Sequence, residues 1–74
     1  MNTVTVRAAC LRFARTHHHD RRIARLTPRE SANFQGANFA IVERNIVRDT
    51  GDIEAVERWC RDAGVLASTE RLAT

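Results

Sequence analysis

Arginine is the residue type with the clearest chemical potential in this chain. All twelve basic residues other than histidine are arginines. The planar guanidinium group donates paired hydrogen bonds to phosphate or carboxylate oxygens, which suits recognition better than a lysine ammonium does. A GC-rich gene would produce the same bias without any functional meaning. The residues that we predict to bind a nucleic acid or a protein partner are Arg7, Arg12, Arg15, Arg21, Arg22, Arg25, Arg29, Asn38 and Arg44.

The charges are unevenly distributed along the chain. Residues 1–29 contain seven arginines and one acid, whereas residues 30–74 contain five arginines and eight acids. A basic front and an acidic back indicate an oriented encounter with an anionic partner, either nucleic acid or an acidic protein surface. The alternative is a solvated basic face that binds nothing.

Three consecutive histidines, His17 to His19, are followed by Asp20 and form a second group that could do chemistry. Consecutive side chains point in different directions, and the spacing does not match the usual zinc-binding patterns. We therefore predict no metal site and no cofactor. We expect a polar loop whose histidines and flanking arginines face solvent or a phosphate backbone, with a local charge that rises below about pH 6.5.

The residues needed for catalysis are not apparent in the sequence. It has no glycine-rich phosphate loop, no HExxH motif and no nucleophile elbow. Cys60 lies beside Trp59 on an apolar helix face, where a structural thiol is the better interpretation. Cys10 and Cys60 are expected to be reduced and buried. We predict that the protein is not an enzyme.

The segment from Asp52 to Gly64 has the clearest helical pattern. Ile53, Val56 and Trp59 fall on one arc, and the charged residues fall on the other. Asp52 is suited to the N-cap and Gly64 to the left-handed position after the last turn. The sequence predicts a helix over 52–63 that holds the core.

A second helix is predicted over 28–49, with an interruption at Gly36. Thr27, Pro28 and Glu30 form a capping-box pattern that marks its start. This region also fits a helix-turn-helix, with Gly36 in the turn and Asn38 and Arg44 near the start of a recognition helix that reaches base edges. A continuous helix across Gly36 is the alternative.

The N-terminal segment has two possible structures. Residues 5–15 have an apolar side and a high alanine content, which favour a helix. Residues 3–15 also alternate like a strand, in which case residues 22–26 could pair with them and make a basic β-hairpin. Residues 67–74 are expected to be a short helix or a frayed tail.

The sequence therefore predicts one small, mainly α domain of three to four helices over residues 1–74. Residues 1–29 form the basic N-terminal element and polar loop, 30–66 the helical core and 67–74 the tail. The limited number of large apolar residues indicates a homodimer, or burial against a larger partner. No apolar run approaches the roughly 20 residues that span a bilayer, so we expect a cytoplasmic protein without a membrane segment.

The expected function is that of a small regulatory protein that binds duplex DNA through its arginine-rich N-terminal face. Affinity should then fall steeply with salt, because phosphate contacts release counterions. The alternative is a protein-binding inhibitor or adaptor that occupies a site on a larger nucleic-acid-handling complex. Such a protein would be antitoxin-like or a phage-type inhibitor comparable to anti-CRISPR proteins, with its arginines as interface anchors.

Overall fold

The computed structural model describes residues 2–17 and 20–73 as a mixed α/β fold. The elements in chain order are β1 (Asn2–Val4), α1 (Val6–Thr16), β2 (Arg21–Arg25), α2 (Pro28–Asn33), β3 (Phe39–Glu43), β4 (Ile46–Gly51), α3 (Ile53–Asp62) and β5 (Glu70–Leu72).

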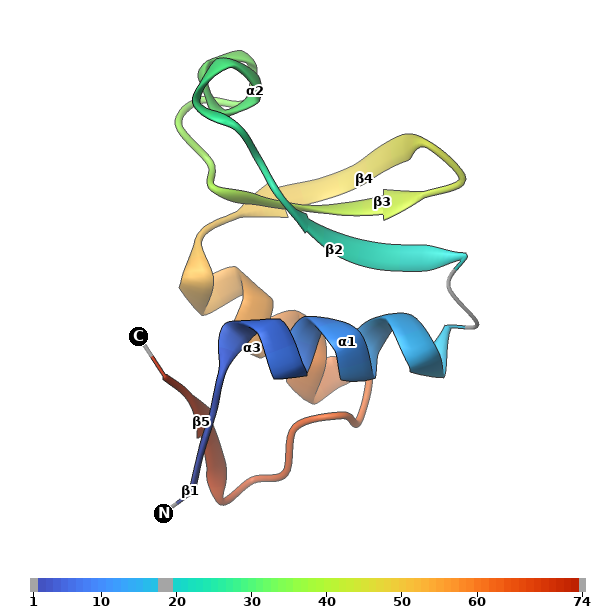
Figure 1. Ribbon diagram of the computed structural model, residues 1–74, viewed down its shortest axis with the longest axis vertical. Helices are drawn as coiled ribbons and strands as arrows, with labels where there is room; N and C mark the ends of the chain where they lie inside the picture. The colour runs from blue at the N-terminus through green and yellow to red at the C-terminus, as the bar shows by residue number, and fades with distance from the viewer. Residues whose placement is uncertain (1, 18–19, 74) are drawn as a thin grey trace.

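A three-stranded antiparallel sheet with the order β2-β3-β4 forms the middle layer (Figure 1). Helices α1 and α3 lie side by side under one face of this sheet, α1 against β2 and α3 against β4. Strands β1 and β5 pair in parallel beneath the helices and bring the two ends of the described chain together. The short helix α2 stands above the sheet at one end.

The core lies between the sheet and the two helices. Phe13 of α1 meets Val56 and Cys60 of α3 there, and all three side chains are fully buried. Ile23 of β2 and Ile41 of β3 lie opposite each other in the sheet and close the core from above. Trp59 is 7% exposed, which confirms that the helix predicted over 52–63 holds the core.

The prediction of a mainly α fold is wrong. The chain is 39% helical and 31% strand, because the helix predicted over 28–49 ends at Asn33. Gln35 and Gly36 both adopt positive φ angles, 58° and 83°, which a helix does not permit and which redirect the chain. Residues 39–51 then form a hairpin in place of the predicted helix.

The hairpin turn explains why this segment is not helical. Arg44 and Asn45 have φ angles of 50° and 67°, as the two central residues of a type I′ turn require. Glu43 and Ile46 are paired on either side of this turn. The predicted helix-turn-helix is therefore wrong as well, because its second helix is replaced by β3 and β4.

At the N-terminus, the helical alternative is confirmed. Helix α1 begins after Thr5, whose side chain accepts a hydrogen bond from the Ala8 amide, and the predicted strand over 3–15 is reduced to β1. The partner of β2 is β3, so no N-terminal basic hairpin forms. The tail is neither a helix nor frayed up to residue 73, because it contains β5.

Two of the predicted helix ends are confirmed in detail. The Thr27 amide donates to Glu30 Oε1 at 2.9 Å, and the Glu30 amide donates to Thr27 Oγ1 at 3.2 Å, which completes the capping box. Gly64 has a φ of 75° after α3. Asp52 occupies the N-cap position without a side-chain capping bond, because its carboxylate accepts a hydrogen bond from Asn38 instead.

Candidate nucleic-acid interface

The basic side of the molecule consists of α1 and β2, which lie next to each other. Helix α1 buries Ala9 and Phe13 against the core and turns Arg7 and Arg15 to solvent. Neither α1 nor β2 contains an acidic residue. The arginines on these two elements are Arg7, Arg12, Arg15, Arg21, Arg22 and Arg25. Two elements separated by a loop thus place six cations on one side of the fold.

Two of these six arginines have acidic partners within the fold. Arg12 Nη1 lies 3.2 Å from Glu70 Oε1 and also donates to the Val65 carbonyl at 3.3 Å. Arg21 Nε lies 3.7 Å from Glu43 Oε1. These arginines stabilise the C-terminal segment and the hairpin, so less of their charge is available to a partner.

The other four arginines form no ion pair within residues 2–17 and 20–73. Arg7, Arg15, Arg22 and Arg25 are all exposed. Arg25 lies over the ring of Phe39, with its Cζ 5.5 Å from the ring centroid, in a cation–π contact. The structure thus leaves four uncompensated guanidinium groups on the basic side.

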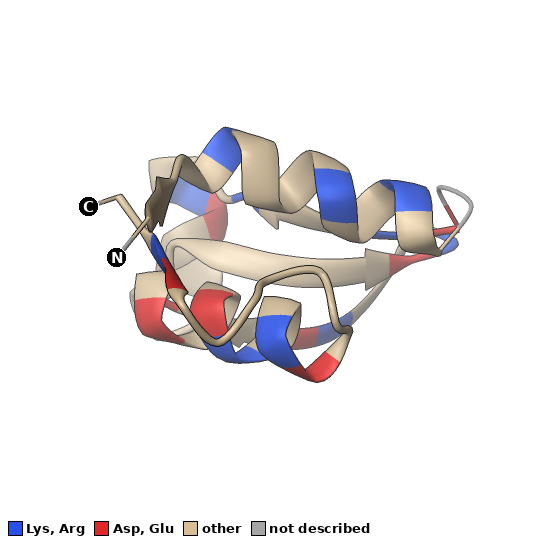
Figure 2. Cartoon of the chain, turned by 90° about the horizontal axis from the view of Figure 1, so that it is seen from below, with Lys and Arg blue, Asp and Glu red and all other residues tan. Residues whose placement is uncertain are grey.

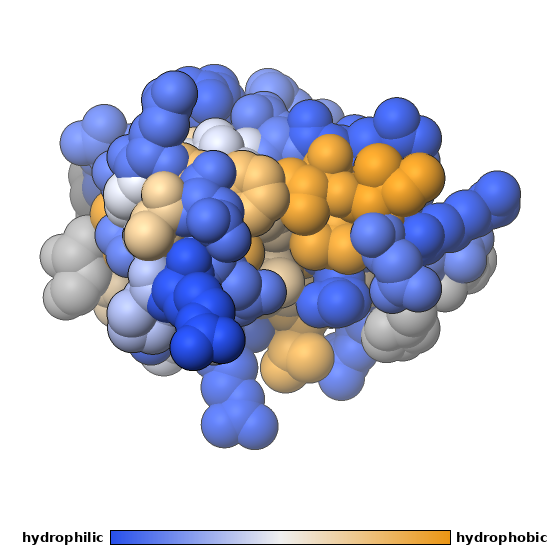
Figure 3. All heavy atoms as spheres, turned by 90° about the horizontal axis from the view of Figure 1, so that it is seen from above, coloured by the Kyte–Doolittle hydropathy of each residue, from blue (hydrophilic) through white to orange (hydrophobic). Residues whose placement is uncertain are grey.

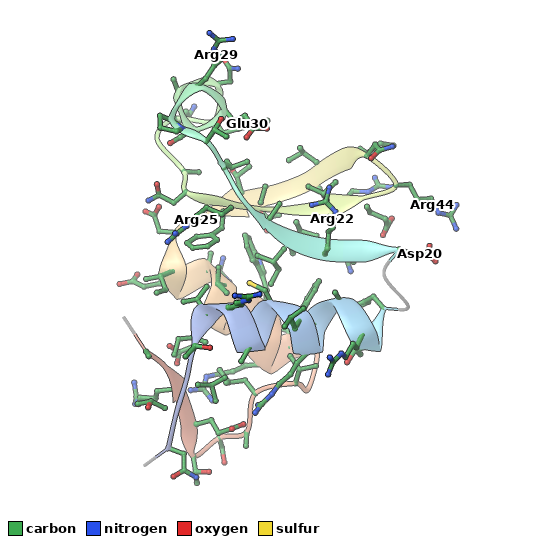
Figure 4. All side chains as sticks on the ribbon, in the orientation of Figure 1. Asp20, Arg22, Arg25, Arg29, Glu30 and Arg44 are labelled. Atoms are coloured by element: carbon green, nitrogen blue, oxygen red, sulfur yellow. The ribbon has the colours of Figure 1, made fainter. Side chains whose placement is uncertain are left out.

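Arg22 and Arg25 project from opposite faces of β2, because side chains alternate along a strand. Arg25 lies on the same face of the sheet as Ile23 and Phe39, near Cys10 of α1. Burial raises the pKa of the Cys10 thiol, and the positive charge of Arg25 lowers this pKa by a smaller amount. Arg22 points to the other side of the sheet, as Figure 4 shows. The four groups therefore form a line around the α1–β2 edge rather than one convergent pocket.

The remaining predicted residues lie elsewhere in the fold. Arg29 is on α2 and Arg44 is in the β3–β4 turn, at opposite ends of the sheet (Figure 4). The Asn38 side-chain amide donates to Asp52 Oδ1 at 3.1 Å and connects the start of β3 to the start of α3. The structure does not bring these three residues together with α1.

Acidic residues gather on the side opposite α1. Helix α3 carries Glu54, Glu57 and Asp62. Figure 2 shows the red bands of α3 across the molecule from the blue bands of α1. Arg61 is compensated there, because its Nη2 lies 2.8 Å from Glu57 Oε1. The uneven charge of the sequence thus becomes a separation of charge between the two helices under the sheet.

The sequence did not point to a polar cavity of about 340 Å³ between α1, the sheet and α3. His17, Arg21, Arg48 and Asp49 are among its lining residues. Glu43 lies between the two arginines, 3.3 Å from Arg48 Nη2, and Asp49 Oδ2 accepts a hydrogen bond from Trp59 Nε1 at 3.2 Å. No local pattern could reveal this cavity, because its lining residues come from five helices and strands and from two positions that follow α1 and α3.

Most of the charged groups of this cavity already have partners, because Arg21 and Arg48 lie near Glu43 and Asp49 accepts a hydrogen bond from Trp59. Both thiols lie outside its lining, and the His17 Nδ1 atom is 2.9 Å from the Phe13 carbonyl oxygen. Within the described ranges, no group of three or more His, Cys, Asp or Glu side chains could hold a metal ion. The prediction for His18 and His19 lies outside the described residues.

No protein-family model, curated protein or solved structure matches this chain. Among the described residues, no helix has the length and apolar character needed to cross a membrane.

Proposed function

We propose that this protein is a small non-enzymatic regulator that binds duplex nucleic acid, with DNA as the expected target, through the basic side formed by α1 and β2. The observation that supports this proposal is the presence of six arginines and no acid on two adjacent elements. Four of these arginines are exposed and have no acidic partner in the described part of the chain.

The proposed contact is made with the phosphate backbone. Arg7 and Arg15 are eight residues apart on α1, which corresponds to roughly 12 Å along the helix axis. Their guanidinium groups can therefore reach different phosphates, each through paired hydrogen bonds. Phosphate contacts carry no direct sequence information. The proposed binding is accordingly insensitive to sequence.

The test is fluorescence anisotropy of a labelled duplex, measured with the whole chain across a salt series. We expect affinity to fall steeply as salt rises. Replacing Arg7 and Arg15 together by alanine should reduce the slope of log K against log salt by roughly 1.8, because each phosphate contact contributes about 0.9. Arg25→Ala should also weaken binding, and more than Arg21→Ala, because Arg21 already interacts with Glu43.

The matched control replaces Arg58 and Arg71, which are exposed arginines of α3 and β5. This variant loses the same formal charge as the Arg7/Arg15 variant and should retain most of the slope. Equal effects of the two double variants would show that only net charge matters. A wild-type protein without salt-dependent binding at low salt would contradict the proposal.

The second candidate function is a protein-binding inhibitor or adaptor that recognises an acidic surface. Its support is the exposed apolar surface outside the core, where Leu11 is 46% exposed and Ile46 is 54% exposed. The homodimer that the sequence predicts is also proposed here, together with a cytoplasmic location. Binding to an acidic protein in the absence of binding to duplex DNA would favour this second function.

A further inference from the structure

The outer face of the sheet, turned away from α1 and α3, is unusually apolar. Antiparallel sheets with one covered face commonly carry polar side chains on the other. From the register, the side chains on the outer face are Arg22, Ala24, Ala40, Val42, Val47 and Thr50. Only the first and the last of these are polar. The outer face is thus built as if a second layer covered it.

These six residues form two rows across the strands. Next to the hairpin turn, Arg22, Val42 and Val47 lie side by side, and toward α2 the row consists of Ala24, Ala40 and Thr50. One end of the outer face therefore carries bulky β-branched side chains, and the other end carries small ones. Ala40, in the middle of the small row, is already covered by the chain itself, so Ala24 and Thr50 are the half-buried positions of this row that a partner can contact.

The bulky row remains partly open to solvent. Val47 is 39% exposed, and Val42 is half-buried. Figure 3, which views this side of the molecule, shows hydrophobic surface bordered by hydrophilic residues. Helix α2 stands on the same side and has no buried residue of its own. Both the valines and α2 thus have surface that a further layer would cover.

Both ends of the outer face carry charges of both signs. Asp20 and Arg44 lie at the hairpin end, and Arg29 and Glu30 lie on α2 at the other end (Figure 4). A hydrogen bond from the Thr27 amide lowers the pKa of Glu30, so its side chain stays a carboxylate. Each end therefore offers an acid and an arginine, and Arg22 is a further cation at the hairpin end.

We propose that a second copy of the chain covers the outer face, related by a twofold axis that lies between the two sheets and runs across the strands. This axis keeps β3 above β3 and reverses the strand direction. Val42 of one copy then lies above the small row of the other, and the hairpin end of each copy meets α2 of its partner. Asp20 faces Arg29 and Arg44 faces Glu30 across the interface, each contact occurring twice.

The other in-plane axis, along the strands, gives a poorer fit. It would set Val42 against Val42 and α2 against α2. The bulky side chains of the two copies would then face each other at one end, and the small side chains would face each other at the other end. A uniformly acidic partner is also less suitable, because both ends of the outer face carry an acid. The self-complementary arrangement is specific to a second copy.

The interface rests on the proposal that the chain is a homodimer, but not on nucleic-acid binding. The test is sedimentation velocity of the whole chain over concentrations up to about 1 mM, where even a weak interface is populated. Val47→Asp would place an unpaired carboxylate in the interface and should weaken dimerisation at least about tenfold. Leu11→Asp, at an apolar position on α1 that is 46% exposed, should leave dimerisation unchanged.

A charge exchange tests the orientation of the two copies. Asp20→Arg should weaken the dimer, and adding Arg29→Asp to it should restore much of the lost affinity, because the pair is then complementary again. Circular dichroism verifies that each variant is folded. A wild-type chain that is monomeric throughout would overturn both the dimer and its interface. A stable dimer that Val47→Asp leaves intact would overturn the interface alone.

Discussion

Cys60 is the residue whose chemistry the fold changes most clearly. Its side chain is completely buried between α1 and α3, and its Sγ donates to the Ala9 carbonyl at 3.8 Å. Burial raises the pKa of the thiol from 9.0 to about 11, with a further contribution from Cys10. A protonated and inaccessible thiol is a poor nucleophile. The structural role predicted for Cys60 from its position on the apolar helix face agrees with this environment.

We predict that the protein loses stability as the pH rises from about 9 to about 11. The folded state keeps its proton on Cys60 in this window, whereas the unfolded chain releases it, so deprotonation favours unfolding. The chain has no tyrosine and no lysine, so no other side-chain type titrates strongly here. Thermal unfolding measured at several pH values should show a falling Tm.

Cys60→Ala is the control for this prediction. It should lower the Tm at neutral pH by removing a packed side chain, and it should make the Tm less dependent on pH. The pH dependence of the Tm that remains in this variant is expected to come from Cys10, because burial also raises the pKa of its thiol. An unchanged pH dependence in Cys60→Ala would contradict the assignment.

Among the elements, α2 depends most on its own capping residues. It has six residues, none of them buried, and begins with the Thr27–Glu30 capping box. Isolated helices this short are not stable without additional interactions. Its stability is therefore expected to be local, with little effect on the core between the sheet and the two longer helices.

We predict that Thr27→Ala unfolds α2 while leaving the global stability nearly unchanged. The substitution removes the oxygen that accepts from the Glu30 amide, and such caps contribute about 1 kcal/mol. Native-state hydrogen exchange should show faster exchange of amides in residues 30–36, with β3 still protected. Thr27→Ser keeps the oxygen and should retain protection. A large loss of global stability in Thr27→Ala would show that α2 is part of the core.

The elements also show what the sequence could predict. Helices α1 and α3 and the start of α2 follow from apolar periodicity and capping residues, which are local signals. The sequence does not reveal the hairpin, because Phe39, Val42 and Ile46 also fit a helical spacing and a single glycine at position 36 is compatible with one interrupted helix. The type I′ turn at Arg44-Asn45 has only a weak local signal, because asparagine tolerates a positive φ but arginine does so rarely. The parallel pairing of β1 with β5 depends on contacts across the whole chain and had no such signal.

The candidate site was predictable to a similar extent. The basic front of the sequence becomes the basic side of the fold, because α1 and β2 are neighbours both in sequence and in space. Which arginines are compensated could not be predicted, since Glu43 and Glu70 lie far from Arg21 and Arg12 in the sequence. The sequence predicts that Asn38 reads a base edge, whereas in the fold its side-chain amide donates a hydrogen bond to Asp52.

At the scale of the whole molecule, the two proposals are geometrically linked. A twofold axis across the strands leaves β2 above β2, so the α1–β2 edges of both copies lie on the same side of the dimer. Two helix layers and two sheets at about 10 Å between layers separate the α1 helices by roughly 30 Å. This separation is close to one turn of duplex DNA, about 34 Å. The proposed dimer would therefore present its two basic sides to successive turns of a single duplex.

We therefore predict that the wild-type protein requires a longer duplex than its monomeric variant does. Anisotropy with labelled duplexes of increasing length should show wild-type affinity rising until the duplex exceeds about one helical turn, because both copies can then contact phosphates. Val47→Asp should lack this rise, and its slope of log K against log salt should be about half that of the wild type, as half of the phosphate contacts are lost. Arg58→Ala, which changes the net charge by the same amount but lies on α3, should keep the length dependence of the wild type. If Val47→Asp is monomeric yet shows the wild-type slope and length dependence, each copy binds DNA independently, and the two proposals are unconnected.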